Sequence, residues 1–200
     1  MSVGSYKGLF GGTTAPDENG FALFSPDQQM TRAEFITVVT RTLFAQELAD
    51  MPVVTDGMWY KNNYWVAVRH GIISKADYAL SEEVLNAPIP RQEMALILIH
   101  ACFAMGESTS SSSRADKIAD FDTIDEAYQG AVLKTYAKGL LTGVDDKGSF
   151  APHQTLTRAE AATVLYRLVN PLKRVSGGLV EFVELPNGFS GIKWSPFVPR

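Results

Sequence analysis

The sequence predicts a mainly α-helical fold made of three helix–loop–helix repeats. Two observations support this prediction. One four-residue block, typical of a helix start, recurs near both ends of the chain, and a glycine preceded by a cation recurs ahead of each helix start. Of the 200 residues, 46% are hydrophobic and 20% are charged, which excludes a disordered or collagen-like chain. The length suits one compact domain or a short run of repeats.

The strongest internal repeat joins a Phe-x-Pro sequence to a Thr-Arg-Ala-Glu block. It stands at residues 24–34 and again, with identical spacing, at residues 150–160. A weaker copy at residues 89–94 keeps the arginine and the glutamate, but it has Pro90 in place of threonine and lacks the upstream Phe-x-Pro. The chain therefore contains three repeats, of which the middle one is degenerate.

The Thr-Arg-Ala-Glu blocks are typical of a capped helix start. Threonine at the N-cap and glutamate three residues later satisfy each other's unpaired backbone amides. We therefore predict one capping box of Thr31 with Glu34 and another of Thr157 with Glu160. Behind these caps, apolar residues recur at steps of three and four, as on a helix that faces a core.

Another helix of each repeat is predicted to end at a glycine. Gly8, Gly71 and Gly139 each follow a lysine or histidine. A cation in the last turn favours the negative end of the helix dipole, and glycine adopts the left-handed cap conformation without steric cost. Only seven residues precede Gly8, so we expect the opening helix of the first repeat to be incomplete.

These signals divide the chain into five segments. They are repeat 1 (1–50), the degenerate repeat 2 (51–107), a serine-rich linker (108–117), repeat 3 (118–172) and a C-terminal extension (173–200). The extension carries partly alternating apolar residues and a Pro-Asn-Gly turn signal at 186–188. This pattern is typical of a β-hairpin, and an exit linker is the alternative.

Charge and composition exclude several classes of function. There are 18 Lys and Arg residues against 22 Asp and Glu residues, a net charge of −4, so the overall surface does not attract nucleic acid. No apolar run approaches the roughly 20 residues that cross a bilayer. The sequence starts without the apolar segment of a secretory signal, which leaves export open. With one cysteine and three scattered histidines, we expect no metal site and no cofactor.

The arginines that follow the cap position are the candidate binding residues. Arg32, Arg91 and Arg158 each stand in a first helical turn, where the positive end of the dipole disfavours a cation by roughly 0.3–1 kcal/mol. The free amides of the same turn attract anions, so a guanidinium beside them suits a carboxylate. Alternatively, each arginine pairs with a nearby Asp or Glu and ties the repeats together. Spacing alone leaves both interpretations open.

Catalysis by carboxylates is the remaining chemical hypothesis. Glycoside hydrolysis needs two acids across a sugar, and Glu34, Glu93 and Glu160 recur at one repeat position. A role in helix capping already explains this recurrence, and no Ser-His-Asp set, P-loop or zinc motif accompanies these residues. We therefore expect no enzymatic activity.

The third repeat resembles an S-layer homology (SLH) module in the order and spacing of its motifs, from Phe121 to Glu160. The first repeat resembles the second half of such a module. The second repeat resembles it through Trp59, Gly71 and Arg91. Together the resemblance covers about residues 8 to 171.

This resemblance implies a pseudo-threefold, mostly helical domain with grooves between the units. SLH modules hold exported proteins on the bacterial cell envelope, commonly by binding secondary cell-wall polysaccharide that often bears a pyruvyl ketal. By resemblance, Arg32, Arg91 and Arg158 match the ligand-contacting arginine of the family. Gly139 and Gly143 match a glycine pair whose backbone lines the groove.

We therefore expect a noncatalytic, extracellular anchoring module at the cell surface that binds an acidic wall polysaccharide between its repeats. No nucleic acid and no membrane insertion are expected. The alternative is a structural or protein-interaction scaffold of the envelope that binds other envelope proteins and no glycan. A glycan-processing enzyme is a third hypothesis.

Overall fold

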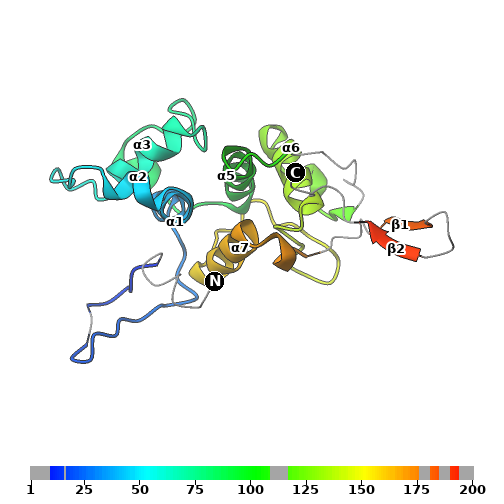
Figure 1. Cartoon of the computed structure of the whole chain (residues 1–200), viewed down its shortest axis with the longest axis horizontal. Coiled ribbons are helices and arrows are strands. Elements are labelled where there is room, and N and C mark those ends of the chain that lie inside the picture. Colours follow the sequence, from blue (N-terminus) through cyan, green and yellow to red (C-terminus); the bar gives the residue numbers. More distant parts are fainter. Residues whose placement is uncertain (1–9, 16, 109–116, 176–180, 185–189, 194–200) are drawn as a thin grey trace.

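The computed structural model describes residues 10–15, 17–108, 117–175, 181–184 and 190–193. It is mainly helical, as predicted, with a small hairpin beside the helices (Figure 1). In chain order the elements are α1 (Arg32–Leu43), α2 (Ala45–Ala49), α3 (Lys61–Arg69), α4 (Glu82–Leu85), α5 (Arg91–Ala104), η3 (Phe121–Thr123), α6 (Glu126–Ala137), α7 (Arg158–Val169), η4 (Pro171–Lys173), β1 (Glu181–Glu184) and β2 (Ser190–Lys193). No helix within these described ranges is long and apolar enough to cross a membrane.

Helices α1 and α7 begin with capping boxes. The hydroxyl groups of Thr31 and Thr157 accept hydrogen bonds from the amides of Glu34 and Glu160, at 3.2 and 3.3 Å. In return, each carboxylate accepts from the amide of its threonine, at 2.8 and 2.9 Å. Both helices therefore start at the same position of their repeats.

The three segments that precede α1, α5 and α7 meet in a closed ring of backbone hydrogen bonds. The amide of Met30 donates to the carbonyl of Leu156 (2.8 Å), that of Leu156 to Ile89 (3.1 Å) and that of Ile89 to Met30 (3.0 Å). The three side chains are completely buried. Isolated β-bridges flank this ring on all sides. The repeats are thus related by an approximate threefold arrangement around these residues.

The helix that opens a repeat packs against the helix that closes the preceding repeat. Helix α3 contacts α1, and α6 contacts α5. Figure 1 shows α5 and α6 side by side. Both α3 and α6 end as predicted, with Gly71 and Gly139 at φ values of +65° and +66°. The next amides, of Ile72 and Leu140, donate back into the last helical turn at 2.8 and 3.0 Å.

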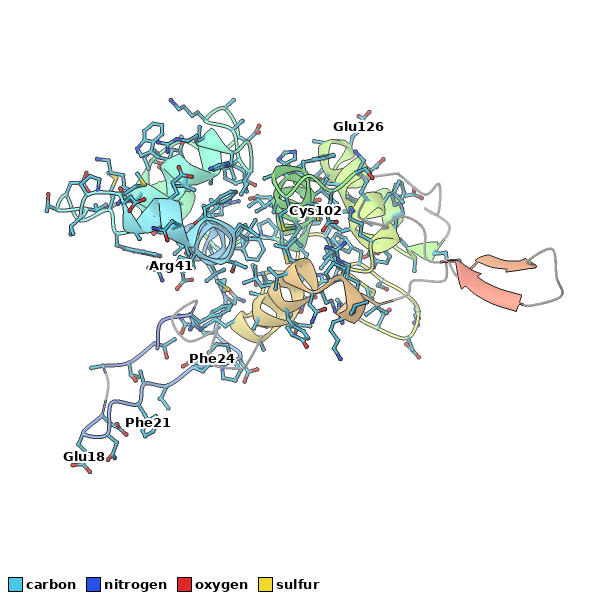
Figure 2. All side chains as sticks on the ribbon, viewed as in Figure 1. Glu18, Phe21, Phe24, Arg41, Cys102 and Glu126 are labelled. Carbon is cyan, nitrogen blue, oxygen red and sulfur yellow. The ribbon has the colours of Figure 1, made fainter. Side chains whose placement is uncertain are left out.

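The beginning of repeat 1 lies largely outside the described part of the chain, including Gly8. Residues 10–15 and 17–30 form loops and turns ahead of α1. They extend away from the helices, with Phe21 near the far end and Phe24 close to them (Figure 2). Residues 109–116 of the predicted serine-rich linker also lie outside the described residues.

One hydrophobic core runs through all three repeats. Helix α5 contributes most of its surface to this core. Cys102 is completely buried there, whereas Arg41 lies at the surface (Figure 2). Burial raises the pKa of the Cys102 thiol to about 12, so this cysteine is a packing residue.

After α7 the chain folds back on the third repeat and on the end of the second. The guanidinium of Arg174 donates two hydrogen bonds to Glu107, at 2.8 and 2.6 Å, and Lys138 donates a third at 2.8 Å. The amide of Val175 donates to the carbonyl of Gly139 at 2.9 Å. Beyond this contact, β1 and β2 pair antiparallel. This pairing confirms the predicted β-hairpin over the exit linker. The predicted turn at 186–188 lies outside the described residues.

Candidate functional site

The backbone amides at the three helix starts already have partners in a neighbouring repeat. The first helical amides donate across the repeat boundaries at 2.9 to 3.0 Å, in the pairs Arg32 to Ala87, Arg91 to Gln154 and Arg158 to Gln28. The second amides of α5 and α7 donate to the carbonyls of Pro152 and Pro26. The expectation that free amides attract an anion is therefore wrong at these positions, because the adjoining repeat supplies the acceptors.

Two of the candidate arginines contact the Phe-x-Pro motif of another repeat. The Nε atom of Arg91 donates to the carbonyl of Phe150 at 2.9 Å, and that of Arg158 donates to the carbonyl of Phe24 at 2.8 Å. Each guanidinium also lies over the ring of the same phenylalanine, with centroid distances of 5.2 and 5.1 Å. Both arginines are only 5% exposed, so they join repeats in this structure.

The Phe-x-Pro motif forms the same unusual turn in both copies. Its middle residues, Ser25 and Ala151, have φ values of 50° and 56°. The left-handed conformation costs a residue with a side chain roughly 1–2 kcal/mol. The turn serves the contact between repeats: the carbonyl of the phenylalanine accepts from the arginine side chain, and that of the proline accepts from the neighbouring helix start.

Arg32 has a different partner because the middle repeat lacks Phe-x-Pro. Its Nε and Nη2 atoms donate to the two carboxylate oxygens of Glu93, at 2.7 and 2.6 Å. Its Nη1 atom donates to the carbonyl of Val84, within α4, at 3.3 Å. The hydrogen bond with Glu93 raises the pKa of Arg32. Arg32 therefore makes the carboxylate pair that the alternative interpretation expected, and Arg91 makes a longer one with Glu160, at 3.4 Å.

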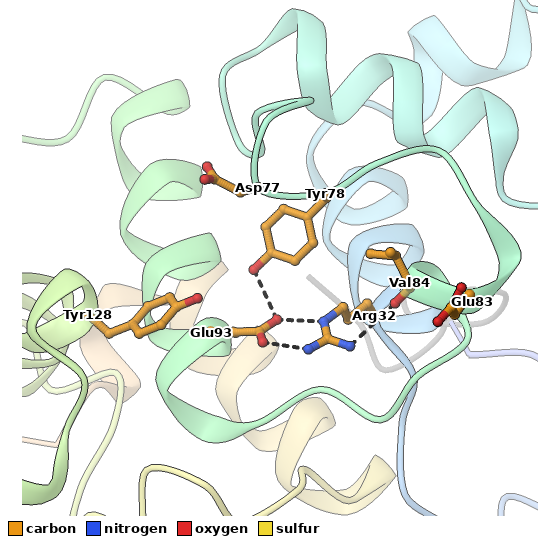
Figure 3. A pocket seen from close by; sticks show the side chains of 7 residues that line it. All are labelled: Arg32, Asp77, Tyr78, Glu83, Val84, Glu93 and Tyr128. Carbon is orange, nitrogen blue, oxygen red and sulfur yellow. Dashed lines mark hydrogen bonds and ion pairs between the residues drawn. The ribbon is translucent and has the colours of Figure 1, made fainter.

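Arg32 and Glu93 also line a cavity of about 270 Å³, called the Arg32 cavity below (Figure 3). Its lining residues are Arg32, Asp77, Tyr78, Glu83, Val84, Glu93 and Tyr128. They come from all three repeats. The Tyr78 hydroxyl donates to Glu93 at 3.2 Å, and burial raises the pKa of Tyr78. Aromatic rings beside carboxylates and a guanidinium are suited to hold a small polar molecule.

The predicted glycine pair does not line this cavity. Gly139 is buried beneath the backbone of Val175. A side chain at Gly143 would meet the backbone of Gly148, in the turn that follows. In this structure both glycines permit close approach of protein backbone.

Glu93 departs from the expectation that it caps its helix. Helix α5 has no side-chain cap, because Pro90 at its N-cap carries no hydroxyl and no amide hydrogen. Sequence reasoning also missed Asp77, Tyr78 and Tyr128. The proline in place of threonine was the available signal that Glu93 differs from its two counterparts.

The comparison with protein families covers the third repeat. Residues 117–162 match the family model of the S-layer homology domain. This segment is an S-layer homology domain. It includes α6, both glycines of the predicted pair and the start of α7 with Arg158. S-layer homology domains are noncatalytic modules that bind cell-wall polysaccharide and anchor bacterial proteins at the cell surface.

Three curated proteins are similar to the chain over 73% of its length. An amylopullulanase of Thermoanaerobacterium thermosulfurigenes is 29% identical over 152 residues. The exoglucanase XynX of Acetivibrio thermocellus is 28% identical over 149 residues, and an endoglucanase of Bacillus sp. (strain KSM-635) is 29% identical over 147. The chain spans only 8, 13 and 15% of these relatives. The similarity thus extends well beyond residues 117–162 and includes much of the second repeat.

Proposed function

We propose that this chain anchors a protein on the bacterial cell wall by binding a sugar of the secondary wall polysaccharide in the Arg32 cavity. The anchored activity is proposed to be a carbohydrate-active enzyme, as the names of the three relatives suggest. The chain itself is proposed to be noncatalytic and to act outside the cell.

The observation that carries this proposal is the Arg32 cavity between the repeats. Its tyrosine rings can pack against the apolar face of a sugar, while its charged groups can pair with hydroxyl groups. The described volume of about 270 Å³ is close to the lower end of small-molecule sites. This size suits one sugar ring of a longer polymer.

The remaining site assignments rest on the family resemblance. That the polymer is acidic and bears a pyruvyl ketal stays a prediction. Glycan contacts of Arg91, Arg158, Gly139 and Gly143 also stay predictions, and in the structure these residues contact neighbouring parts of the protein. A ligand that reached the arginines would have to replace those contacts.

Retention on purified cell walls tests the proposal. The protein should sediment with intact wall material and stay in solution when the secondary polysaccharide has been removed chemically. Arg32→Ala should weaken retention by about tenfold, since it removes the group that holds the Glu93 carboxylate in the cavity, and hydrogen bonds to a charged group contribute about 1.5–3 kcal/mol. Arg41→Ala is the matched control, because Arg41 is exposed on the same helix.

Circular dichroism and gel filtration of both variants establish that they are folded. Retention that survives removal of the polysaccharide would contradict glycan binding and favour the protein-scaffold alternative. Wild-type retention of a folded Arg32→Ala variant would place the glycan site elsewhere. Sugar release from the wall by the chain alone would contradict the noncatalytic assignment.

A further inference from the structure

Each of the three repeats has a glutamate at the third position of a helix, but the side chains of these glutamates do not share the same hydrogen-bond partner. Glu34 and Glu160 accept from the amide of their own N-cap threonine. The corresponding residue of the middle repeat, Pro90, has no amide hydrogen. Its backbone angles, φ −76° and ψ 154°, are close to those of Thr31, φ −83° and ψ 165°. The proline therefore removes the partner of Glu93 without changing the chain path.

The carboxylate of Glu93 is consequently available to the arginine of the first repeat. It forms the two short contacts with Arg32, at 2.7 and 2.6 Å. The equivalent pair at the next repeat boundary is Arg91 with Glu160, which are 3.4 Å apart. Glu160 keeps its cap, and Arg91 keeps its contact with Phe150. The same two positions thus give a tight ion pair where proline is present and a loose one where threonine is present.

This pairing changes what the Arg32 cavity can accept. The guanidinium of Arg32 already holds a carboxylate, and the Tyr78 hydroxyl donates to the same group. The Arg32 and Glu93 side chains are only 19% and 11% exposed. Asp77 and Glu83 add two more acidic groups to the lining. Taken together, the lining carries three carboxylates and one guanidinium, so its net charge is negative and favours a cation over an anion.

Resting on the proposed anchoring function, we propose that the Arg32 cavity selects a sugar residue that bears hydroxyl or amine groups and no carboxylate. The carboxylate of Glu93 determines which sugar the cavity accepts. Glu93 is available for this role because Pro90 has no amide hydrogen for it to accept. Hydroxyl and ammonium groups donate hydrogen bonds, which the carboxylates of the cavity accept. A sugar carboxylate would have to displace Glu93 from Arg32 and leave that carboxylate without its counter-ion, which is unfavourable at low exposure.

Titration with three defined sugars tests the selection. The probes are the methyl glycosides of glucosamine, N-acetylglucosamine and glucuronic acid, and the readout is the NMR signal of the Arg32 Nε–H group. The wild type should bind the glucosamine and N-acetylglucosamine glycosides and respond least to the glucuronide. Glu93→Gln should raise the affinity for the glucuronide by about tenfold, because it frees a guanidinium for a carboxylate.

Glu160→Gln is the matched control, since Glu160 faces Arg91 across the other boundary, and it should leave the sugar preference unchanged. Equal or better binding of the glucuronide by the wild type overturns the proposal. So does an unchanged preference in Glu93→Gln, or the absence of any response to the three sugars. Wall retention of the wild type, measured in parallel, separates failure of this selection from failure of the anchoring function.

The role of Pro90 has a second test that needs no sugar. Phenylglyoxal modifies accessible, unpaired guanidinium groups, and mass spectrometry reports the rate at Arg32. Glu93→Gln should increase this rate severalfold over the wild type. Pro90→Thr supplies a threonine amide and hydroxyl that compete for Glu93 and should give an intermediate rate. Modification of Arg32 in Pro90→Thr at the wild-type rate would overturn the part assigned to Pro90.

Discussion

The Nε atom of Arg158 donates a hydrogen bond of 2.8 Å to the carbonyl oxygen of Phe24, which lies 134 positions earlier in the chain. The same guanidinium donates to the carbonyl of Gly11 at 2.6 Å and contacts the ring of Phe10, with a centroid distance of 5.4 Å. A residue that resembles a ligand contact of the S-layer homology family thus joins the third repeat to the first. Its role in stability can be separated from any role in binding.

Replacing Arg158 with alanine should lower the free energy of unfolding by about 2–4 kcal/mol, because the carbonyls of Phe24 and Gly11 lose a charged donor and the ring of Phe24 loses its partner. Arg158→Lys keeps the charge without the paired donors and should show an intermediate loss. Urea denaturation measures both, with Arg41→Ala as an exposed control. A loss below about 0.5 kcal/mol, the usual range of surface substitutions, would show that this contact is not a structural joint.

Thr31→Ala and Thr157→Ala should each lower the free energy of unfolding by about 1 kcal/mol, since each variant leaves a helix amide without its hydroxyl acceptor. Thermal unfolding followed by circular dichroism measures the effect. Pro90→Ala is the comparison, because α5 has no side-chain cap to lose. Unchanged stability of both threonine variants would mean that the capping boxes contribute nothing.

Gly139→Ala should destabilise the protein more than Gly71→Ala does. Both glycines have nearly the same positive φ, so each substitution carries a backbone cost of about 1 kcal/mol. At Gly71 the added Cβ meets nothing, whereas at Gly139 it overlaps the carbonyl of Val175. The difference between the two variants in denaturant unfolding therefore measures the contact between the third repeat and the C-terminal extension. Equal losses would show that residue 175 moves aside freely.

The stability of the wild type should fall in acid in part because of Glu107. Burial raises the pKa of this carboxyl, but hydrogen bonds and charges from Arg174 and Lys138 outweigh burial and hold the pKa below its ordinary value of 4.5. A lowered folded-state pKa contributes stability above pH 4.5 and loses it as the pH falls through the folded-state value. Glu107→Gln should be less stable at neutral pH and less sensitive to pH below 4.5, measured by urea unfolding across that range. If the free energies of unfolding of the wild type and of Glu107→Gln changed equally with pH, this contribution of Glu107 would be excluded.

Features encoded by neighbouring residues were predictable from the sequence. The capping boxes depend on residues three apart, and the glycine ends of α3 and α6 depend on residues within one turn. The partners of the arginines were not predictable in this way. Arg91 and Arg158 contact a phenylalanine carbonyl of another repeat, and nothing in the spacing within one repeat indicates which repeat is adjacent.

The Arg32 cavity shows the same limit. The sequence shows that Pro90 cannot cap, which is a local property, but not that Glu93 then reaches Arg32, 61 positions away. Tyr128 reaches the cavity because α6 packs against α5, and Asp77 reaches it from the turn between α3 and α4. A site between repeats is therefore visible only once the repeats are assembled.

The ring formed by Met30, Leu156 and Ile89 distinguishes this molecule from an open repeat array. In a linear solenoid each unit touches only its neighbours, so a unit can be added or removed at an end. Here the first and last units are also neighbours, so deleting either one breaks two boundaries at once. In such a circular order the loss of one unit affects both of the others, so an attachment to the cell surface that depends on all three would be lost as a whole.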